Sequence, residues 1–311
     1  MLVDTHAHIQ FAKYKEDAEA VMQRALDSGM TVINVGSQID TSKQAVEMLS
    51  KYPEHVYAAV GLHPVHTWKH NFTDVDEIQD DFFTREESFN YEAYKQLAEH
   101  PKVVGIGECG LDYYRLPNSD TKDTNAHTND ANNTADKSAR YREDNENNVE
   151  IKRRQKEAFL EQIRLAQELD KTLIIHCRPS SGTTDAYDDI LSILLKIKDE
   201  GLRIPRFEVH CFTGPLSIAQ KFIELGGYIG LNGIITFDKT GVSEEVVKNI
   251  PLESIVLETD SPYLTPAPHR GKRNEPVFVE LVAKKIAEWK GVSFDEVANT
   301  TAANAKKLFN I

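Results

Sequence analysis

Eight short apolar runs, spread along the whole chain, restrict most strongly the fold that this sequence can adopt. Turn-forming residues bound each run, and most runs are separated by stretches with helical periodicity. Near-continuous apolar strands that alternate with helices are typical of a parallel sheet covered on both faces. Eight such units in 311 residues favour an α/β fold of the closed (β/α)8 TIM-barrel type. The runs are residues 2–5, 31–35, 56–60, 103–106, 172–175, 207–209, 227–230 and 255–257.

The main alternative is an open, doubly wound sheet. A sheet of that kind is expected to carry a glycine-rich phosphate-binding turn after its first strand. In this sequence His6 and His8 stand there instead. We therefore predict one barrel domain over residues 1–311.

Composition and charge limit the class of partner. A formal net charge of −13 argues against a broad basic surface, so a nucleic acid would have to be held by a local site. The sequence has no run of 18 apolar residues and no signal-peptide pattern, which predicts a cytoplasmic protein without a membrane contact. Nothing in the sequence implies an obligate protein partner. Three cysteines imply no disulfide framework, and each is expected to point toward the helices: Cys109, Cys177 and Cys211.

One segment interrupts the alternation of strands and helices. Residues 116–148 are rich in Asn, Asp and Thr and almost empty of apolar residues. Such a composition cannot bury enough surface to offset the entropy of ordering the chain. Because the segment follows the fourth run, it should emerge at the C-terminal face of a barrel, where active sites lie. We predict a low-complexity, mobile insert there, followed by an amphipathic helix over residues 149–169.

Ionisable side chains follow six of the eight runs. Residues i and i+2 of a strand point the same way, so His6 and His8 should project together, as two imidazoles that suit a divalent cation. Singly, His63 could be a turn residue, Glu108 a helix cap and His176 half of a structural pair. Together they favour a metal site, because buried unpaired charges are costly and strand ends of a barrel converge on one mouth. The set comprises His6, His8, His63, Glu108, His176, His210, Glu258 and Asp260.

Six motifs in this sequence form a distinctive set. They are Asp4-Thr5-His6-Ala7-His8, Gly61-Leu62-His63-Pro64, Gly107-Glu108-Cys109-Gly110-Leu111-Asp112, His210-Cys211-Phe212-Thr213-Gly214, Glu258-Thr259-Asp260-Ser261-Pro262-Tyr263-Leu264 and Arg270-Gly271-Lys272-Arg273-Asn274-Glu275-Pro276. These motifs resemble the signatures of the TatD family, whose members are metal-dependent deoxyribonucleases on a TIM-barrel scaffold related to the amidohydrolases. The resemblance runs from residue 2 to about residue 309, apart from the 116–148 insert.

The resemblance implies a two-cation site in which Glu108 is shared. One divalent cation would be held by His6, His8, Glu108 and Asp260, and the other by Glu108, His176 and His210. Two cations of this kind clamp the attacking and leaving oxygens of a phosphoryl displacement. Glu108 and Asp260 are then the expected catalytic residues, with Asp260 orienting or deprotonating the attacking water. The ion could be Mg, Mn or Zn. Glu258 and Asp4 could each orient a ligand or form a buried ion pair.

The substrate expected from the resemblance is DNA, cleaved from the 3' end of a single strand, since a deep barrel mouth admits an end more easily than a duplex. His63 and Arg178 are candidates for gripping a phosphate. Arg270, Lys272 and Arg273 form either a strip that follows the nucleic-acid backbone or a solvated loop. The alternatives are a D-aminoacyl-tRNA deacylase-like ester hydrolase, an amidohydrolase acting on a small substrate, and a metal-storing protein. Amidohydrolases commonly place a carboxylated lysine on the fourth strand as the group that bridges two metals. That alternative is disfavoured here because the fourth run offers Glu108 and no lysine after Lys102.

Overall fold

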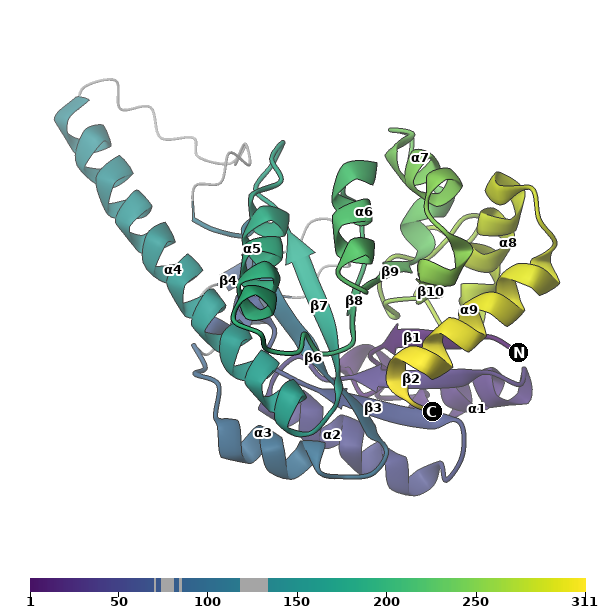
Figure 1. Ribbon diagram of the computed structural model, residues 1–311. Coiled ribbons are helices and arrows are strands. Elements are labelled where there is room, and N and C mark those ends of the chain that lie inside the picture. Colours follow the sequence, from purple (N-terminus) through teal and green to yellow (C-terminus); the bar gives the residue numbers. More distant parts are fainter. Residues whose placement is uncertain (70, 74–80, 84–85, 118–133) are drawn as a thin grey trace.

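The eight predicted runs form one parallel sheet in a nearly closed barrel, and the TIM-barrel prediction is confirmed (Figure 1). The computed structural model describes residues 1–69, 71–73, 81–83, 86–117 and 134–311. Backbone hydrogen bonds join the first and last strands, from His8 N–H to Ser261 O at 2.8 Å and from Asp260 N–H to His6 O at 2.8 Å. The strands, in sheet order, are β1 (Val3–Ala7), β2 (Thr31–Val35), β3 (Val56–Val60), β6 (Val103–Asp112), β7 (Thr172–Arg178), β8 (Phe207–Val209), β9 (Tyr228–Leu231) and β10 (Ile255–Leu257).

Helices follow the strands and surround them (Figure 1). A short antiparallel pair, β4 (Asn71–Thr73) and β5 (Asp81–Phe83), is inserted between β3 and the next helix. The helices are α1 (Ala18–Asp27), α2 (Ile39–Met48), α3 (Tyr91–Ala98), α4 (Thr134–Glu168), α5 (Asp185–Asp199), α6 (Leu216–Glu224), α7 (Val242–Asn249), α8 (Val279–Lys290) and α9 (Phe294–Phe309). Single 3-10 turns cover Ala12–Tyr14, Leu49–Lys51, Pro64–Thr67, Gly233–Thr236, Leu252–Ser254 and Pro276–Phe278.

The apolar core has two parts, which lie on the two faces of the sheet. The larger part lies between the strands and the helices, where Val32, Val60 and Ile175 pack. The smaller part lies inside the barrel and includes Ile33 and Ile174, with Leu308, Phe309 and other residues of α9 packed against it. Helix α9 therefore covers one end of the barrel with apolar side chains, and the polar strand ends described below occupy the other.

Asn304 holds α9 against the barrel. Its buried side-chain amide donates to Leu252 O at 2.9 Å and to Ile255 O at 2.7 Å. The substitution Asn304→Ala is expected to lower the free energy of unfolding by about 1–3 kcal/mol, because it leaves buried carbonyl groups without a donor. Urea unfolding followed by circular dichroism measures the loss. Lys307→Ala, at an exposed position of the same helix, should stay within about 0.5 kcal/mol of the parent protein. An Asn304 variant as stable as that control would contradict this assignment.

The last part of the predicted insert is helical. Helix α4 begins at Thr134, so residues 134–148 belong to the helix that was predicted to begin at residue 149. The physical reason is that extending an existing helix costs far less than nucleating one, and this stretch contains Ala, Lys, Arg and Glu residues. Figure 1 shows α4 reaching well beyond the barrel. Residues 118–133 lie outside the described residues. Within the described residues, none of the helices has the length and apolar character needed to cross a membrane.

Two of the three cysteines lie as expected. Cys109 and Cys177 are buried in the core between the sheet and the helices. The prediction was wrong for Cys211, which is only half-buried and whose sulfur lies within 4.8 Å of a nitrogen of His210 and a carboxylate oxygen of Glu258. The reason is that β8 ends at Val209, so strand alternation no longer decides where residue 211 points; its φ is +50°.

Candidate metal centre

The six predicted metal ligands meet at one end of the barrel, with Glu108 among them. Strands β6 and β7 run further than predicted and carry Glu108 and His176 into the mouth. Gly110 permits the close pairing of these strands, because a Cβ there would lie 2.1 Å from His176 O. As a result, His176 Nδ1 lies 2.8 Å from Glu108 Oε1.

Three further imidazoles approach the same carboxylate. His6 Nε2 lies 3.5 Å from Glu108 Oε2, while His63 Nε2 and His210 Nε2 lie 3.4 and 3.7 Å from Oε1. The carboxylate is buried. Burial alone would raise the pKa of Glu108, but the neighbouring imidazoles, His63 first among them, hold it well below its usual range. Glu108 is therefore an anion with both oxygens turned toward histidines.

His6 and His8 bring two nitrogens face to face, 3.1 Å apart. His8 Nδ1 donates to Val35 O at 2.7 Å, so a neutral His8 ring has its lone pair on Nε2. Burial by itself lowers the pKa of His8, but the carboxylates of Asp260 and Glu108 raise it. Burial, and then the charge of His210, lower the pKa of His6 to about 4, so this ring is neutral. Neutral imidazole nitrogens that point into one space are the donor arrangement that a divalent cation requires.

Asp260 completes this side of the cluster. Its Oδ1 lies 3.3 Å from His8 Nε2, 3.8 Å from His6 Nε2 and 3.9 Å from His210 Nε2. Its φ of +56° is unusual for a non-glycine residue and places the carboxylate at the mouth. Burial opposes ionisation of Asp260, but the hydrogen bond with His8 and the nearby imidazoles keep its pKa below the usual value.

His210 is held from behind by Glu258. Its Nδ1 donates to Glu258 Oε2 at 2.9 Å, and Glu258 also accepts from Cys211 N–H at 2.7 Å and Asn232 Nδ2 at 3.1 Å. Gly230 leaves room for this carboxylate, since a Cβ there would lie 2.6 Å from Oε2. Of the two roles left open by the sequence, the geometry supports the orienting one.

Asp4 lies on the seam between β1 and β10 instead of behind a histidine ring. Its carboxyl group accepts from Thr259 Oγ1 at 2.6 Å and from Thr259 N–H at 2.9 Å. It thereby fixes the backbone immediately before Asp260. Burial raises the pKa of Asp4 to about 8, against the lowering effect of the Thr259 hydrogen bonds.

Asp112 is a member of the cluster that the sequence analysis did not assign. His176 Nε2 lies 3.2 Å from Asp112 Oδ2, and Arg115 pairs with the same oxygen at 2.8 Å. Burial lowers the pKa of His176 by itself, but the carboxylates of Asp112 and Glu108 raise it. The sequence did offer a signal for Asp112. An even number of positions separates it from Glu108 on one strand, and this spacing favours two side chains on the same side of the sheet.

His63 differs from the other histidines in the position of its proton. Val65 N–H donates to His63 Nδ1 at 3.2 Å, so the neutral ring carries its hydrogen on Nε2, facing Glu108. Burial, and then the charge of His176, lower the pKa of His63 to about 4, which keeps the ring neutral. A neutral ring with this proton is a hydrogen-bond donor at the mouth instead of a metal ligand.

Comparison with known proteins shows the family to which this chain is similar. The family described as TatD related DNase matches residues 3–310. The chain is 37% identical over 312 residues to an uncharacterized metal-dependent hydrolase, YabD, of Bacillus subtilis, with 100% of each chain covered. It is 30% identical over 316 residues to a 3'-5' ssDNA/RNA exonuclease TatD of Citrobacter rodentium, covering 100% of this chain and 98% of the relative. The crystal structure of YJJV, a TatD homologue of Escherichia coli K12, matches with a TM-score of 0.73 and 27% identity, covering 100% of this chain and 98% of that one.

This chain belongs to the TatD family. The predicted resemblance is confirmed, and with it the prediction of a hydrolase that acts on ester bonds. The TatD-family motifs quoted from the sequence contain five of the six predicted metal ligands. The sixth, His176, lies on β7 directly after the apolar run 172–175.

Within the described residues, no hydrogen bond or ion pair joins the cationic side chains expected to bind substrate to the six candidate metal ligands of this TatD-family protein. The guanidinium of Arg178 lies over the ring of Tyr114 at 4.0 Å, and that of Arg270 over Phe237 at 3.7 Å. Lys272 is exposed. Arg273 forms an ion pair with Asp17 at 2.6 Å, so it is committed to the fold. The predicted basic strip is therefore reduced to Arg270 and Lys272.

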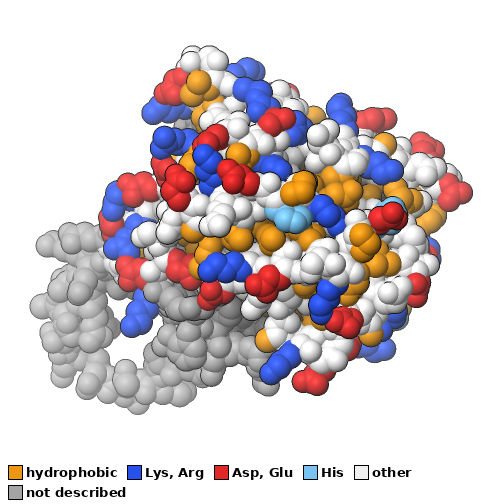
Figure 2. Space-filling model, turned by 90° about the horizontal axis from the view of Figure 1, so that it is seen from below, with side chains coloured by type: hydrophobic (Ala, Val, Ile, Leu, Met, Phe, Trp, Pro, Cys, Tyr) orange, Lys and Arg blue, Asp and Glu red, His pale blue; other side chains and the backbone are white. Residues whose placement is uncertain are grey.

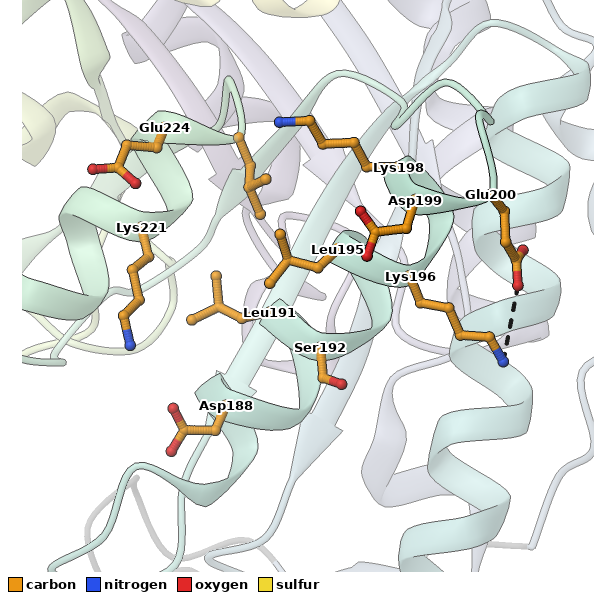
Figure 3. A pocket seen from close by; sticks show the side chains of 11 residues that line it. Asp188, Leu191, Ser192, Leu195, Lys196, Lys198, Asp199, Glu200, Lys221 and Glu224 are labelled. Atoms are coloured by element: carbon orange, nitrogen blue, oxygen red, sulfur yellow. Dashed lines mark ion pairs between the residues drawn. The ribbon is translucent and has the colours of Figure 1, made fainter.

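Other parts of the surface of this TatD-family protein are poorer candidates for a site. A groove of about 790 Å³ lies between α5 and α6 on the outside of the barrel, lined by Leu191, Leu195 and charged residues such as Lys221 (Figure 3). It contains none of the predicted site residues. On the face shown in Figure 2, Lys and Arg side chains are interspersed with Asp and Glu, and no broad basic area is visible among the described residues there.

Proposed function

We propose that this TatD-family hydrolase cleaves phosphodiester bonds of DNA as a 3'-5' exonuclease on single-stranded ends, with two divalent cations. The observation that carries the proposal is that one buried carboxylate, Glu108, lies within 3.7 Å of a nitrogen of each of four histidines. The name of the Citrobacter relative, a 3'-5' ssDNA/RNA exonuclease, supports a nucleic-acid substrate. We further propose that residues 1–311 act as one cytoplasmic catalytic domain without an obligate protein partner.

The residues present fit two cations that share Glu108. His6, His8, Glu108 and Asp260 would hold one, and Glu108, His176 and His210 the other. The lone pair on His8 Nε2 and the anionic carboxylates supply donors of the right kind, and Asp112 can retain the Nε2 proton of His176 and leave Nδ1 for coordination. When bound, Mg, Mn or Zn ions would polarise the phosphodiester and make water a stronger nucleophile.

The chain's own residues supply the remaining chemistry. Asp260, at the mouth, accepts the proton of the attacking water. Glu108 belongs to both proposed sets of metal ligands and so connects them. His63 donates its Nε2 hydrogen to a phosphate oxygen, because Val65 already occupies Nδ1. Arg178 lies two residues beyond His176 on the same strand and offers its planar fork to a second phosphate. Arg270 and Lys272 contact the backbone further along the strand.

Aromatic rings beside the mouth favour the proposal that the substrate is single-stranded. Phe11 stacks on His8 with ring centres 4.4 Å apart and planes 12° apart, and Tyr263 lies 6.5 Å from Phe11. Lys13 lies over Tyr263 at 5.1 Å. Half-buried aromatic rings next to cations are the components on which unpaired bases stack, and a base in a duplex has no free face to offer them.

Phe11→Ala is expected to weaken binding of a single-stranded oligonucleotide by about 5- to 150-fold, since base stacking contributes about 1–3 kcal/mol per base. Fluorescence anisotropy of a 3'-labelled oligonucleotide measures the change. Trp289→Ala is the matched control, because Trp289 is also a half-buried aromatic residue, but it lies on α8, where Lys285 is 4.9 Å from its ring. Equal affinities of the Phe11 variant and the parent protein would remove stacking from the proposal.

The substrate class is tested by comparing the hydrolysis of two types of ester. Single-stranded DNA labelled at its 3' or 5' end, and a D-aminoacyl-tRNA, are each incubated with the protein, with and without chelator. We expect metal-dependent release of mononucleotides from the 3' end and no comparable deacylation. Faster deacylation than DNA cleavage would favour the tRNA alternative, and hydrolysis of neither would leave an amidohydrolase activity on a small substrate to be examined.

A further inference from the structure

A buried carboxyl group on β8 has no part in the chemistry proposed above. Glu208 is 0% exposed, and neither Oε1 nor Oε2 has a hydrogen-bond partner within the described residues. Thr5, a nearby hydroxyl group, gives its hydrogen to Leu257 O at 3.2 Å. An apolar side chain of similar size would avoid the cost of burying a carboxyl group without a partner. The position of Glu208 therefore needs an explanation beyond packing.

His6 also has a buried polar atom without a hydrogen-bond partner within the described residues. The Nδ1 atoms of His8 and His210 are both bonded, to Val35 O and to Glu258, whereas Nδ1 of His6 is buried without a partner. A ring nitrogen of His6 and one oxygen each of Glu208 and Glu258 lie within 4.8 Å of one another. Glu258 already accepts three hydrogen bonds. Glu208 is thus the carboxyl group beside His6 that still has its accepting capacity.

We propose that Glu208 is the positioning residue for His6, which donates its Nδ1 hydrogen to a Glu208 oxygen, directly or through one water molecule, when Nε2 holds a cation. Histidines that bind metals almost always donate the other ring N–H to a carboxylate, a carbonyl or water. The His6 ring is stacked on His210 at 3.6 Å, so fixing one ring restrains the other. This inference rests on the metal centre of the proposed function.

The test compares Glu208→Leu and Glu208→Gln with the parent protein. Calorimetric titration of metal-free protein with Mn²⁺ alone measures affinity, and thermal unfolding of the metal-free protein measures stability. Glu208→Leu should weaken Mn²⁺ binding by about 10- to 100-fold. It should at the same time raise the melting temperature of the metal-free protein, because a partnerless carboxyl group is replaced by an apolar one. Glu208→Gln keeps an acceptor oxygen and should remain closer to the parent protein in affinity.

The control is Ile33→Val, a change inside the barrel at a residue of the apolar cluster around α9. It should lower the melting temperature and leave Mn²⁺ affinity unchanged. Unchanged affinity in Glu208→Leu, or a parallel loss of affinity and stability, would overturn the inference. If the parent protein itself bound no Mn²⁺, the proposed function would fail instead. Should the leucine variant not fold, Glu208→Met, which also lacks an acceptor oxygen, takes its place.

Discussion

Glu108→Ala is expected to lower the rate of DNA hydrolysis by at least about 10³-fold while the protein still unfolds cooperatively. The carboxylate is the group common to both halves of the proposed centre, with oxygens 2.8 Å from His176 Nδ1 and 3.5 Å from His6 Nε2. Bound cations contribute several kcal/mol to a phosphoryl-transfer transition state, and each 1.36 kcal/mol corresponds to about tenfold in rate. Single-turnover cleavage of a single-stranded oligonucleotide measures the loss, and urea unfolding reports the fold.

The matched control for that variant is Glu168→Ala. Glu168 is also a carboxylate with two partners, since it pairs with Lys95 and Tyr91 at 2.5 Å, but it is an exposed residue at the end of α4. Its removal should leave the protein folded, because surface ion pairs contribute little to stability. Because Glu168 is not one of the predicted site residues, the cleavage rate should stay within about twofold of that of the parent protein. Turnover retained in Glu108→Ala would refute the shared carboxylate. A non-cooperative transition would show that the loss of rate reflects the fold instead.

Removal of divalent cations is expected to abolish hydrolysis and to lower the melting temperature. The histidines and carboxylates of the mouth form a donor set only in the folded chain, because they come from residues 6 to 260. A ligand that binds only the folded state stabilises it by RT ln(1 + [L]/Kd), about 2.7 kcal/mol when the free ion is at 100 times its Kd. Dialysis against chelator, followed by titration of Mg²⁺, Mn²⁺ or Zn²⁺ with parallel rate and unfolding measurements, tests both effects.

The two readouts should recover over the same range of ion concentration. Glu108→Ala serves as the control for the stability effect, since without the shared carboxylate the added ions should raise the melting temperature much less. Full activity in the presence of a strong chelator would contradict a metal-dependent reaction. Recovery of activity without any change in melting temperature would place the ion outside the folded protein's own donor set.

Much of the barrel and of its site was predictable from local pattern. The apolar runs depend on side-chain hydrophobicity, and the placement of His6, Glu108, His176 and His210 after them follows from the convergence of parallel strand ends. Predictions from the sequence were poorest where the structure of a residue depends on neighbouring elements more than on its own composition or alternation pattern. The polar segment before residue 149 continues a helix that is nucleated elsewhere, and Cys211 lies past the end of β8, where alternation no longer applies.

The sequence by itself determined the order of strands and helices and the identity of the side chains brought to the mouth, because both depend on spacing along the chain. Only the tertiary structure decided which nitrogen of each histidine is free. Val35 O leaves Nε2 of His8 open, Val65 N–H puts the proton of His63 on Nε2, and Asp112 Oδ2 lies 3.2 Å from Nε2 of His176. The proton positions of His8 and His176 follow from hydrogen-bond partners that are distant in sequence, and no pattern of residue types contains that information.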